Sequence, residues 1–176
     1  LTQLAKYKGA IVFGTTSSDK KIEQLITNKV DYPINYKKQN FEEEVNKITQ
    51  GEGVDVAFDA VGGSNFKRSL KLLNCGGSII SFRAGSFVGA NSIFKKIQTF
   101  LSFGFYHPIM LMRKSISIQS VDMYNISKNR PDLLQRIMED TENYIEKGIL
   151  KPIEVTVFPI AELSKAFGLL EQGKNI

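Results

Sequence analysis

Short apolar segments alternate with helix-like segments through the first half of the chain, and this alternation constrains the fold most strongly. The strand candidates are apolar along their length, which is typical of strands covered by helices on both faces. They are Ala10–Phe13, Asp31–Asn35, Val54–Phe58 and Ser78–Phe82. The segments between them have the apolar spacing of helices, and these are Ser18–Asn28, Asn40–Gln50 and Ser64–Leu73. Such alternation predicts βαβ units and a doubly wound parallel sheet of the α/β class.

The second half of the chain continues with weaker patterns. Apolar and polar residues alternate in Ser115–Val121, as in a strand with one exposed face. Pro131 suits the first turn of a helix that runs to about Lys147, and Gly148 ends it. A last strand, a last helix and an amphipathic helix are predicted at Ile153–Phe158, Ile160–Gln172 and Asn91–Leu101. No linker divides the chain, so we predict one domain over residues 1–176.

Composition narrows the kinds of partner. The chain is 42% hydrophobic, which suits one domain with a real core. A net charge of +5 and a pI near 9.2 suit an anionic ligand. The basic residues are scattered, however, which favours a mildly basic surface over a nucleic-acid site.

The chain contains one cysteine, Cys75, and one histidine, His107. These counts exclude an internal disulfide and a zinc cage of cysteines and histidines. Nothing at the start of the sequence has the pattern of a signal peptide, and no run of about 18 apolar residues could cross a bilayer. We therefore expect a protein of the reduced cytoplasm without a transmembrane segment. Cys75, which precedes Gly76-Gly77, is expected to be a structural thiol at a helix end, and His107 has no neighbours that suggest a catalytic triad.

Both ends of the chain look cut. Leu1–Lys6 has the pattern of the closing turns of a helix, and Asn175-Ile176 leads into something further. A doubly wound domain should begin with a strand, a glycine-rich turn and a helix. No G-x-G-x-x-G motif occurs in this sequence, so we expect the first strand and its turn to be missing.

The end of the second strand of that domain carries the most informative residues. Domains that bind NAD have an acidic residue here, which accepts hydrogen bonds from the ribose hydroxyls and would repel a 2′-phosphate. This sequence instead has GTTSS from Gly14 to Ser18, followed by Lys20 and Lys21. Hydroxyls, free N–H groups and the positive end of a helix dipole together form an anion site. The alternative is an ordinary helix cap with solvated lysines; in a βαβ context we favour phosphate binding.

Other strand ends add to this pattern. Tyr36 follows the next strand, where it could lie beside the phosphate or be a surface tyrosine without a role. The turns FDAVGG (Phe58–Gly63) and SFRAGS (Ser81–Ser86) follow two further strands, at the edge where open α/β sheets bind ligands. Asp55 and Asp59 are too far apart in sequence for paired acid–base work, and no residue is assigned as a catalytic acid. The apolar Phe94–Phe105 segment favours core packing or the lining of a substrate pocket over contact with lipid.

Several segments, in order and spacing, resemble the cofactor domain of the medium-chain dehydrogenases/reductases. They are LTQLAK, KGA, IVFGTTSS, VDYPINY, GEGVDVAFDAVGG, GGSIISF, RKSISIQSVDMYNI, GILKPIEVTVFPIAEL and KAFGLLEQGKNI. The most similar branch is the zinc-free quinone oxidoreductase, or zeta-crystallin-like, group, which includes homologues of the synaptic vesicle membrane protein. The resemblance covers essentially the whole chain.

This resemblance implies a Rossmann-like fold, an NADPH cofactor and hydride transfer to a quinone or an α,β-unsaturated carbonyl. The chain would be the cofactor-binding part, without the GroES-like catalytic domain, and inactive alone. By resemblance, the adenosine 2′-phosphate would be surrounded by Thr15, Ser17, Lys20 or Lys21, and Tyr36. Val61 would lie along the cofactor, and Phe82 with the following loop, including Ala84, near the nicotinamide.

One residue departs from the pattern of the family. Arg83 stands where the family usually has glycine, which lets the backbone approach a ligand closely. Arg83 could instead contact the pyrophosphate or a substrate carbonyl. Two alternatives to the enzyme remain: a nucleotide-binding structural or membrane-associated adaptor without turnover, and a fragment that binds no cofactor.

The half-exposed strand Ser115–Val121 predicts a homodimer. It should lie at or near the sheet edge, where unpaired N–H and C=O groups must be covered or paired. In the resembled family the corresponding strand pairs with its two-fold copy. The alternative is an edge covered by Phe94–Phe105, which would leave a monomer.

Overall fold

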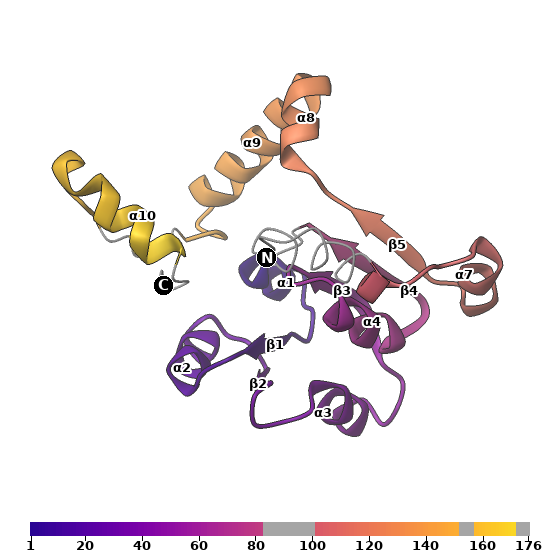
Figure 1. The fold of residues 1–176 in the computed structure, drawn as a ribbon. Coiled ribbons are helices and arrows are strands. Elements are labelled where there is room, and N and C mark those ends of the chain that lie inside the picture. Colours follow the sequence, from indigo (N-terminus) through magenta and orange to yellow (C-terminus); the bar gives the residue numbers. More distant parts are fainter. Residues whose placement is uncertain (83–100, 152–156, 172–176) are drawn as a thin grey trace.

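A computed structural model describes residues 1–82, 101–151 and 157–171, which form an α/β fold with parallel strands (Figure 1). The elements follow one another in chain order as α1 (Thr2–Tyr7), β1 (Phe13–Thr16), α2 (Asp19–Thr27), β2 (Tyr32–Asn35), α3 (Phe41–Ile48), β3 (Val54–Asp59), α4 (Ser64–Lys71), β4 (Leu73–Ser81), α7 (Pro108–Lys114), β5 (Ser117–Ser120), α8 (Met123–Asn129), α9 (Pro131–Glu146), the 3-10 helix η1 (Ile160–Glu162) and α10 (Leu163–Glu171).

The strands form two parallel sheets, one of β1 and β2 and the other in the order β3-β4-β5. The predicted doubly wound, parallel fold is therefore confirmed. A Rossmann sheet has the strand order 3-2-1-4-5-6. If β1 is the second strand of a Rossmann sheet, then β2, β3, β4 and β5 are its strands 3, 4, 5 and 6. No described strand takes the place of the central first strand. The edges of β1 and β3 that would flank that strand lack a strand partner in the part of the chain that is described.

Several predicted boundaries were wrong. The first strand begins at Phe13, not Ala10, and therefore includes Gly14. A Cβ on Gly14 would lie 2.9 Å from the Val30 side chain and 3.3 Å from that of Leu25, so this glycine lets α2 and the segment before β2 pack closely against β1. The fourth strand begins at Leu73, not at Ser78 as predicted, and runs through Gly76-Gly77. Because β4 extends this far, Cys75 is an exposed strand residue and not a structural thiol at a helix end.

The sequence did not predict two of the helices, and two predicted elements lie largely outside the described residues. Short α7 and α8 are set by their first residues, since Pro108 opens α7 and Asp122 caps α8 by accepting from the N–H groups of Tyr124 and Asn125. The predicted C-terminal helix consists of η1 followed by α10. The predicted strand at 153–158 falls largely on residues 152–156, and most of the predicted helix at 91–101 falls on 83–100; both stretches lie outside the described residues.

A small core joins the two sheets through α3. Ile34 of β2, Phe41 and Val45 of α3, and Leu72 at the end of α4 are buried together, with Phe13 and Val54 packed against them. Burial of each such side chain contributes roughly 1.5–3 kcal/mol. The core therefore holds the sheets together, although no pairing between described strands connects them.

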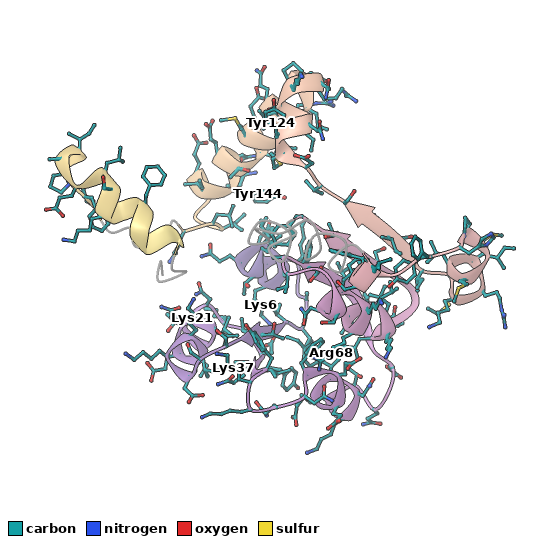
Figure 2. All side chains as sticks on the ribbon, viewed as in Figure 1. Lys6, Lys21, Lys37, Arg68, Tyr124 and Tyr144 are labelled. Atoms are coloured by element: carbon teal, nitrogen blue, oxygen red, sulfur yellow. The ribbon has the colours of Figure 1, made fainter. Side chains whose placement is uncertain are left out.

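Arg68 of α4 strengthens this connection between α4 and α3 (Figure 2). Its Nε donates to Glu42 at 2.8 Å, and a second guanidinium nitrogen donates to Asn40 at 2.5 Å. The guanidinium also lies 4.0 Å from the centre of the Phe41 ring. One side chain thus makes three contacts with the first turn of α3.

The helix α1 is attached to both halves of the chain. The Lys6 ammonium lies 2.7 Å from the carboxylate of Asp31, which also accepts from the Val12 N–H and lies just before β2. The hydrogen bond from Lys6 is the main cause of a lowered pKa at Asp31. At the same end of the helix, Tyr7 meets Tyr144 of α9 by edge contact, with the ring centroids 6.1 Å apart. Figure 1 shows α8, α9 and α10 lying outside the two sheets.

Candidate functional site

The carboxyl ends of β1 and β2 bring three predicted residues together. Thr15 is in register with Ile34, and the N–H of Tyr36 donates to the carbonyl of Thr16 at 3.0 Å. Tyr36 therefore follows β2 directly beside the point where β1 leads into Ser17. Thr15 and Tyr36 are exposed and Ser17 is half-buried, so this edge presents hydroxyl groups to a ligand.

The same edge is the start of α2. Ser18 is its extended N-cap residue, yet its side chain makes no capping hydrogen bond. The alternative of an ordinary serine cap is therefore not supported. Lys20 is exposed and Lys21 half-buried in the first turn, and Figure 2 shows Lys21 in this part of the molecule. N–H groups at a helix start favour anions, and the adjacent hydroxyls and lysines add donors and positive charge.

A carboxylate that sequence reasoning did not weigh also lies here. Asp19 accepts from the Asn35 amide at 2.8 Å and from the Lys38 ammonium at 2.6 Å. The hydrogen bond from Lys38, followed by that from Asn35, lowers the pKa of Asp19, so the carboxylate is ionised at neutral pH. Lys38 offsets its charge, which reduces the repulsion that Asp19 would exert on a bound phosphate. The signal in the sequence was an acidic residue at the first helical position with Lys37-Lys38 after the next strand.

The second group of predicted residues lies at the carboxyl ends of β3 and β4. Asp59 is almost fully buried, and its carboxylate accepts from the N–H groups of Val61 at 3.3 Å and Gly62 at 2.9 Å. Gly62 has φ +81°, and a Cβ there would overlap the ring of Phe103, so only glycine fits this turn. The N–H of Phe82 donates to the Asp59 carbonyl at 3.2 Å. Phe82 is thus tied to the residue that holds the Val61 turn, and the side chains of Val61 and Phe82 remain about half exposed.

The two groups of residues lie on different sheets, both at carboxyl ends of strands. Ligands of open α/β sheets bind at this edge, so one extended ligand could contact both groups. Arg83 and Ala84, which were predicted to continue the second group, lie outside the described residues.

Other polar residues have local roles. The side chain of His107 caps α7 by accepting from the N–H of Ile109 at 3.3 Å. Asp55 is exposed and accepts from Asn74, so it does not form an acid–base pair with Asp59. In the described ranges no helix is both long and apolar enough to cross a membrane.

The fold and this edge define a class of protein, the doubly wound α/β domains that bind nucleotides. More specifically, the chain belongs to the zinc-binding dehydrogenase family, which matches residues 1–139. The resemblance to the medium-chain dehydrogenases/reductases is thereby confirmed.

Known proteins similar to this chain include a reducing polyketide synthase, an enoyl reductase and a quinone oxidoreductase. The chain is 25% identical to the reducing polyketide synthase rads1 of Floropilus chiversii over 99% of its own length and 7% of that protein. It is 26% identical to the CurK enoyl reductase, with a TM-score of 0.75 over 98% of this chain and 47% of that one. It is 24% identical to a quinone oxidoreductase of Escherichia coli, solved in complex with NADPH, with a TM-score of 0.72 over 97% and 49% of the chains. The chain thus spans about half of these solved structures and a small part of the synthase.

The family is named for the binding of zinc, and a zinc site requires several ligating side chains. Within the described parts of the chain, no three His, Cys, Asp or Glu side chains are grouped so that they could hold a metal ion. The only cysteine is exposed in β4, and the only histidine is used as a helix cap. These residues do not fit a zinc centre, and zinc-free activity of the whole protein stays a prediction.

Proposed function

We propose that this chain is the cofactor-binding part of an NADPH-dependent oxidoreductase that transfers hydride to a quinone or an α,β-unsaturated carbonyl. The observation that carries this proposal is the group of exposed and half-buried hydroxyls at the start of α2. The enoyl reductase and the quinone oxidoreductase with NADPH, which share the fold, support it.

The residues at the carboxyl ends of β1 and β2, which form the first group, would determine which cofactor binds. The hydroxyls of Thr15 and Ser17 and the N–H groups at the start of α2 donate to the 2′-phosphate, while Lys20 and Lys21 supply positive charge. Tyr36 adds a further hydroxyl from the neighbouring strand. Because the Lys38 ammonium is paired with the Asp19 carboxylate, the negative charge of Asp19 repels an anion at this group less strongly.

The residues of the second group would orient the reactive end. A reduced nicotinamide, when bound, supplies the hydride. Val61 and Phe82 present apolar side chains that exclude water from this end, and the buried carboxylate of Asp59 holds the turn on which Val61 stands. We assign no general acid, and the acceptor would be a small carbonyl compound or quinone.

The test is a comparison of NADPH and NADH affinities for the whole protein. A charged contact to phosphate contributes on the order of 1–3 kcal/mol, so we expect NADPH to bind at least about tenfold more tightly. Lys20→Ala with Lys21→Ala should erode this preference. The control Lys47→Ala, an exposed lysine of α3, should not.

Equal affinities for the two cofactors in the unmutated protein would contradict the proposal. Tight NADPH binding without substrate-dependent oxidation of NADPH would favour the adaptor without turnover. No binding of either cofactor by the whole protein would contradict both.

We also propose that the gap between β1 and β3 receives one parallel strand from the whole protein, and that a GroES-like domain provides most substrate contacts. The edge of β5 that has no strand partner among the described residues would form the homodimer. The N–H of Val121 donates to the Ser81 carbonyl and the carbonyl of Ser115 accepts from Gly76. Because backbone groups alternate along a strand, those of Ile118 and Ser120 point away from β4 and could pair with a second copy. The reduced cytoplasm remains the expected compartment.

A further inference from the structure

A cavity of about 360 Å³ lies between α4, α7 and residues 104–106. Lys71 at the end of α4 lies shortly before β4, and Lys114 at the end of α7 lies shortly before β5. Both therefore lie near the amino ends of these strands, whereas Val61 and Phe82 lie at the carboxyl ends. The volume of the cavity is in the range of cavities that hold small molecules.

One part of the cavity is apolar. This part is lined by Leu70, which is half-buried, and by Ile116, which is buried. Met110 is an exposed residue at the mouth of the cavity. A methionine side chain is flexible and adapts to ligands of different shape. An alkyl chain bound here would lose contact with water along its length, which is favourable.

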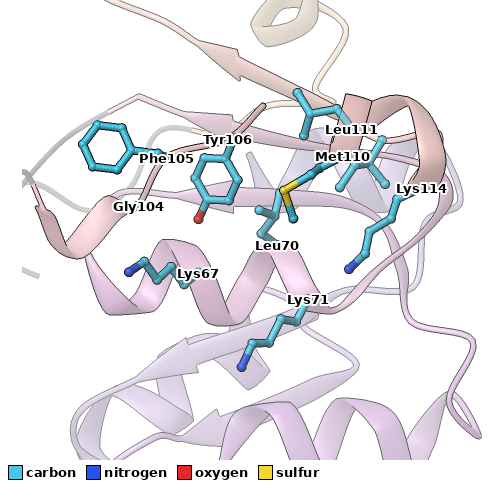
Figure 3. A pocket seen from close by; sticks show the side chains of 10 residues that line it. Lys67, Leu70, Lys71, Gly104, Phe105, Tyr106, Met110, Leu111 and Lys114 are labelled. Carbon is cyan, nitrogen blue, oxygen red and sulfur yellow. The ribbon is translucent and has the colours of Figure 1, made fainter. Parts of the chain in front are cut away.

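The other part of the cavity is positively charged. Figure 3 shows Lys67, Lys71 and Lys114 around Leu70 and Met110. None of the described residues that line the cavity is acidic, and none of the three ammonium groups forms an ion pair with a described residue. An anion in this cavity would therefore meet positive charge and, among the described lining residues, no carboxylate.

The remaining polar group at the cavity is already engaged. The Tyr106 hydroxyl donates to the carbonyl of Phe103 at 2.8 Å, and burial raises its pKa. Its proton is therefore not available to a ligand. Recognition of an anion depends on the lysines.

We propose that this cavity binds an amphipathic anion, namely a carboxylate on an alkyl chain of medium length. The carboxylate lies among Lys67, Lys71 and Lys114, and the chain lies on Leu70, Met110 and Ile116. The site is independent of the proposed oxidoreductase activity, because it shares no residue with the cofactor groups.

The probe is monomeric decanoate, titrated calorimetrically into the whole protein at low ionic strength. The triple variant Lys67→Gln, Lys71→Gln, Lys114→Gln should bind decanoate at least about tenfold more weakly, since charge-assisted contacts to a carboxylate are lost. A control with the same change of net charge at exposed lysines elsewhere, Lys47→Gln, Lys128→Gln, Lys147→Gln, should bind as the unmutated protein does.

A second variant tests the apolar part. Met110→Glu introduces a negative charge at an exposed position, so the protein should fold and decanoate should be repelled; Met110→Leu should preserve binding. Decanol, which has the same chain without the charge, should bind much more weakly than decanoate. Equal binding of decanol, equal affinity in the lysine triple variant, or binding to anionic vesicles without binding of monomeric decanoate would each overturn the proposal.

Discussion

Replacement of Asp59 by alanine tests how the turn beside the cofactor edge is held. The carboxylate is 2% exposed and is the acceptor for two backbone N–H groups, those of Val61 and Gly62. A hydrogen bond to a charged group contributes about 1.5–3 kcal/mol, and a buried donor left without a partner costs about 1–3 kcal/mol. Because Gly62 is buried, we expect Asp59→Ala to lower the free energy of unfolding by about 2–4 kcal/mol, within these ranges.

Urea denaturation of the whole protein measures this change. With a slope of about 2 kcal/mol per molar urea, the middle of the usual range, the midpoint should fall by roughly 1–2 M. Asp59→Asn should cost less, since one oxygen of Asp59 already accepts from both N–H groups and the amide oxygen can retain that role. Asp140→Ala, an exposed aspartate of α9, should change stability by no more than about 0.5 kcal/mol.

Two results would refute this reasoning. If Asp59→Ala unfolds at the same urea concentration as the unmutated protein, the carboxylate does not hold the turn. If alanine and asparagine at position 59 are equally destabilising, the negative charge matters and the hydrogen-bond acceptor does not. The affinity for NADPH should also fall more in the alanine variant than in the asparagine variant, because Val61 stands on the turn.

Three further predictions concern oligomeric state, metal and pH. Ser120→Pro removes a donor that points away from β4, so light scattering at micromolar concentration should show loss of the dimer while circular dichroism shows a folded chain; an unmutated protein that is already monomeric would exclude pairing through β5. Activity of the whole protein should survive chelation of metals, and activity that disappears and returns only with zinc would count against this. The pKa of Asp132 lies at about 2, below its ordinary value of 3.8, chiefly because Arg130 donates hydrogen bonds to its carboxylate. The stability that ionised Asp132 contributes is therefore complete above the ordinary pKa and is lost as the pH falls toward 2. A titration of Asp132 followed by NMR should show a midpoint near this pKa, and Arg130→Ala should raise the midpoint. An unchanged midpoint in Arg130→Ala would contradict the assigned cause.

The sequence alone predicted the class of the fold and the location of the first group of site residues. The period of apolar residues reports which faces are covered, and it separates strands such as Tyr32–Asn35 from helices such as Phe41–Ile48 with errors of only a few residues. In a parallel sheet all carboxyl ends lie at one edge. Thr15, Ser17 and Tyr36 could therefore be expected at one edge of the sheet, and their binding of a cofactor stays a prediction.

Only the tertiary structure decided the partners of charged groups and the course of the strands through glycine. Asp19 is separated from Lys38 by a helix and a strand, and their pairing depends on how β1 and β2 are aligned. The extension of β4 through Gly76-Gly77 depends on its neighbours, because Gly76 donates to the carbonyl of Ser115. The lysine-lined cavity likewise requires α4 and α7, which are far apart in sequence, to lie side by side. Local patterns determine which side of a segment is buried, whereas the identity of the group that meets it is set by the packing of distant segments.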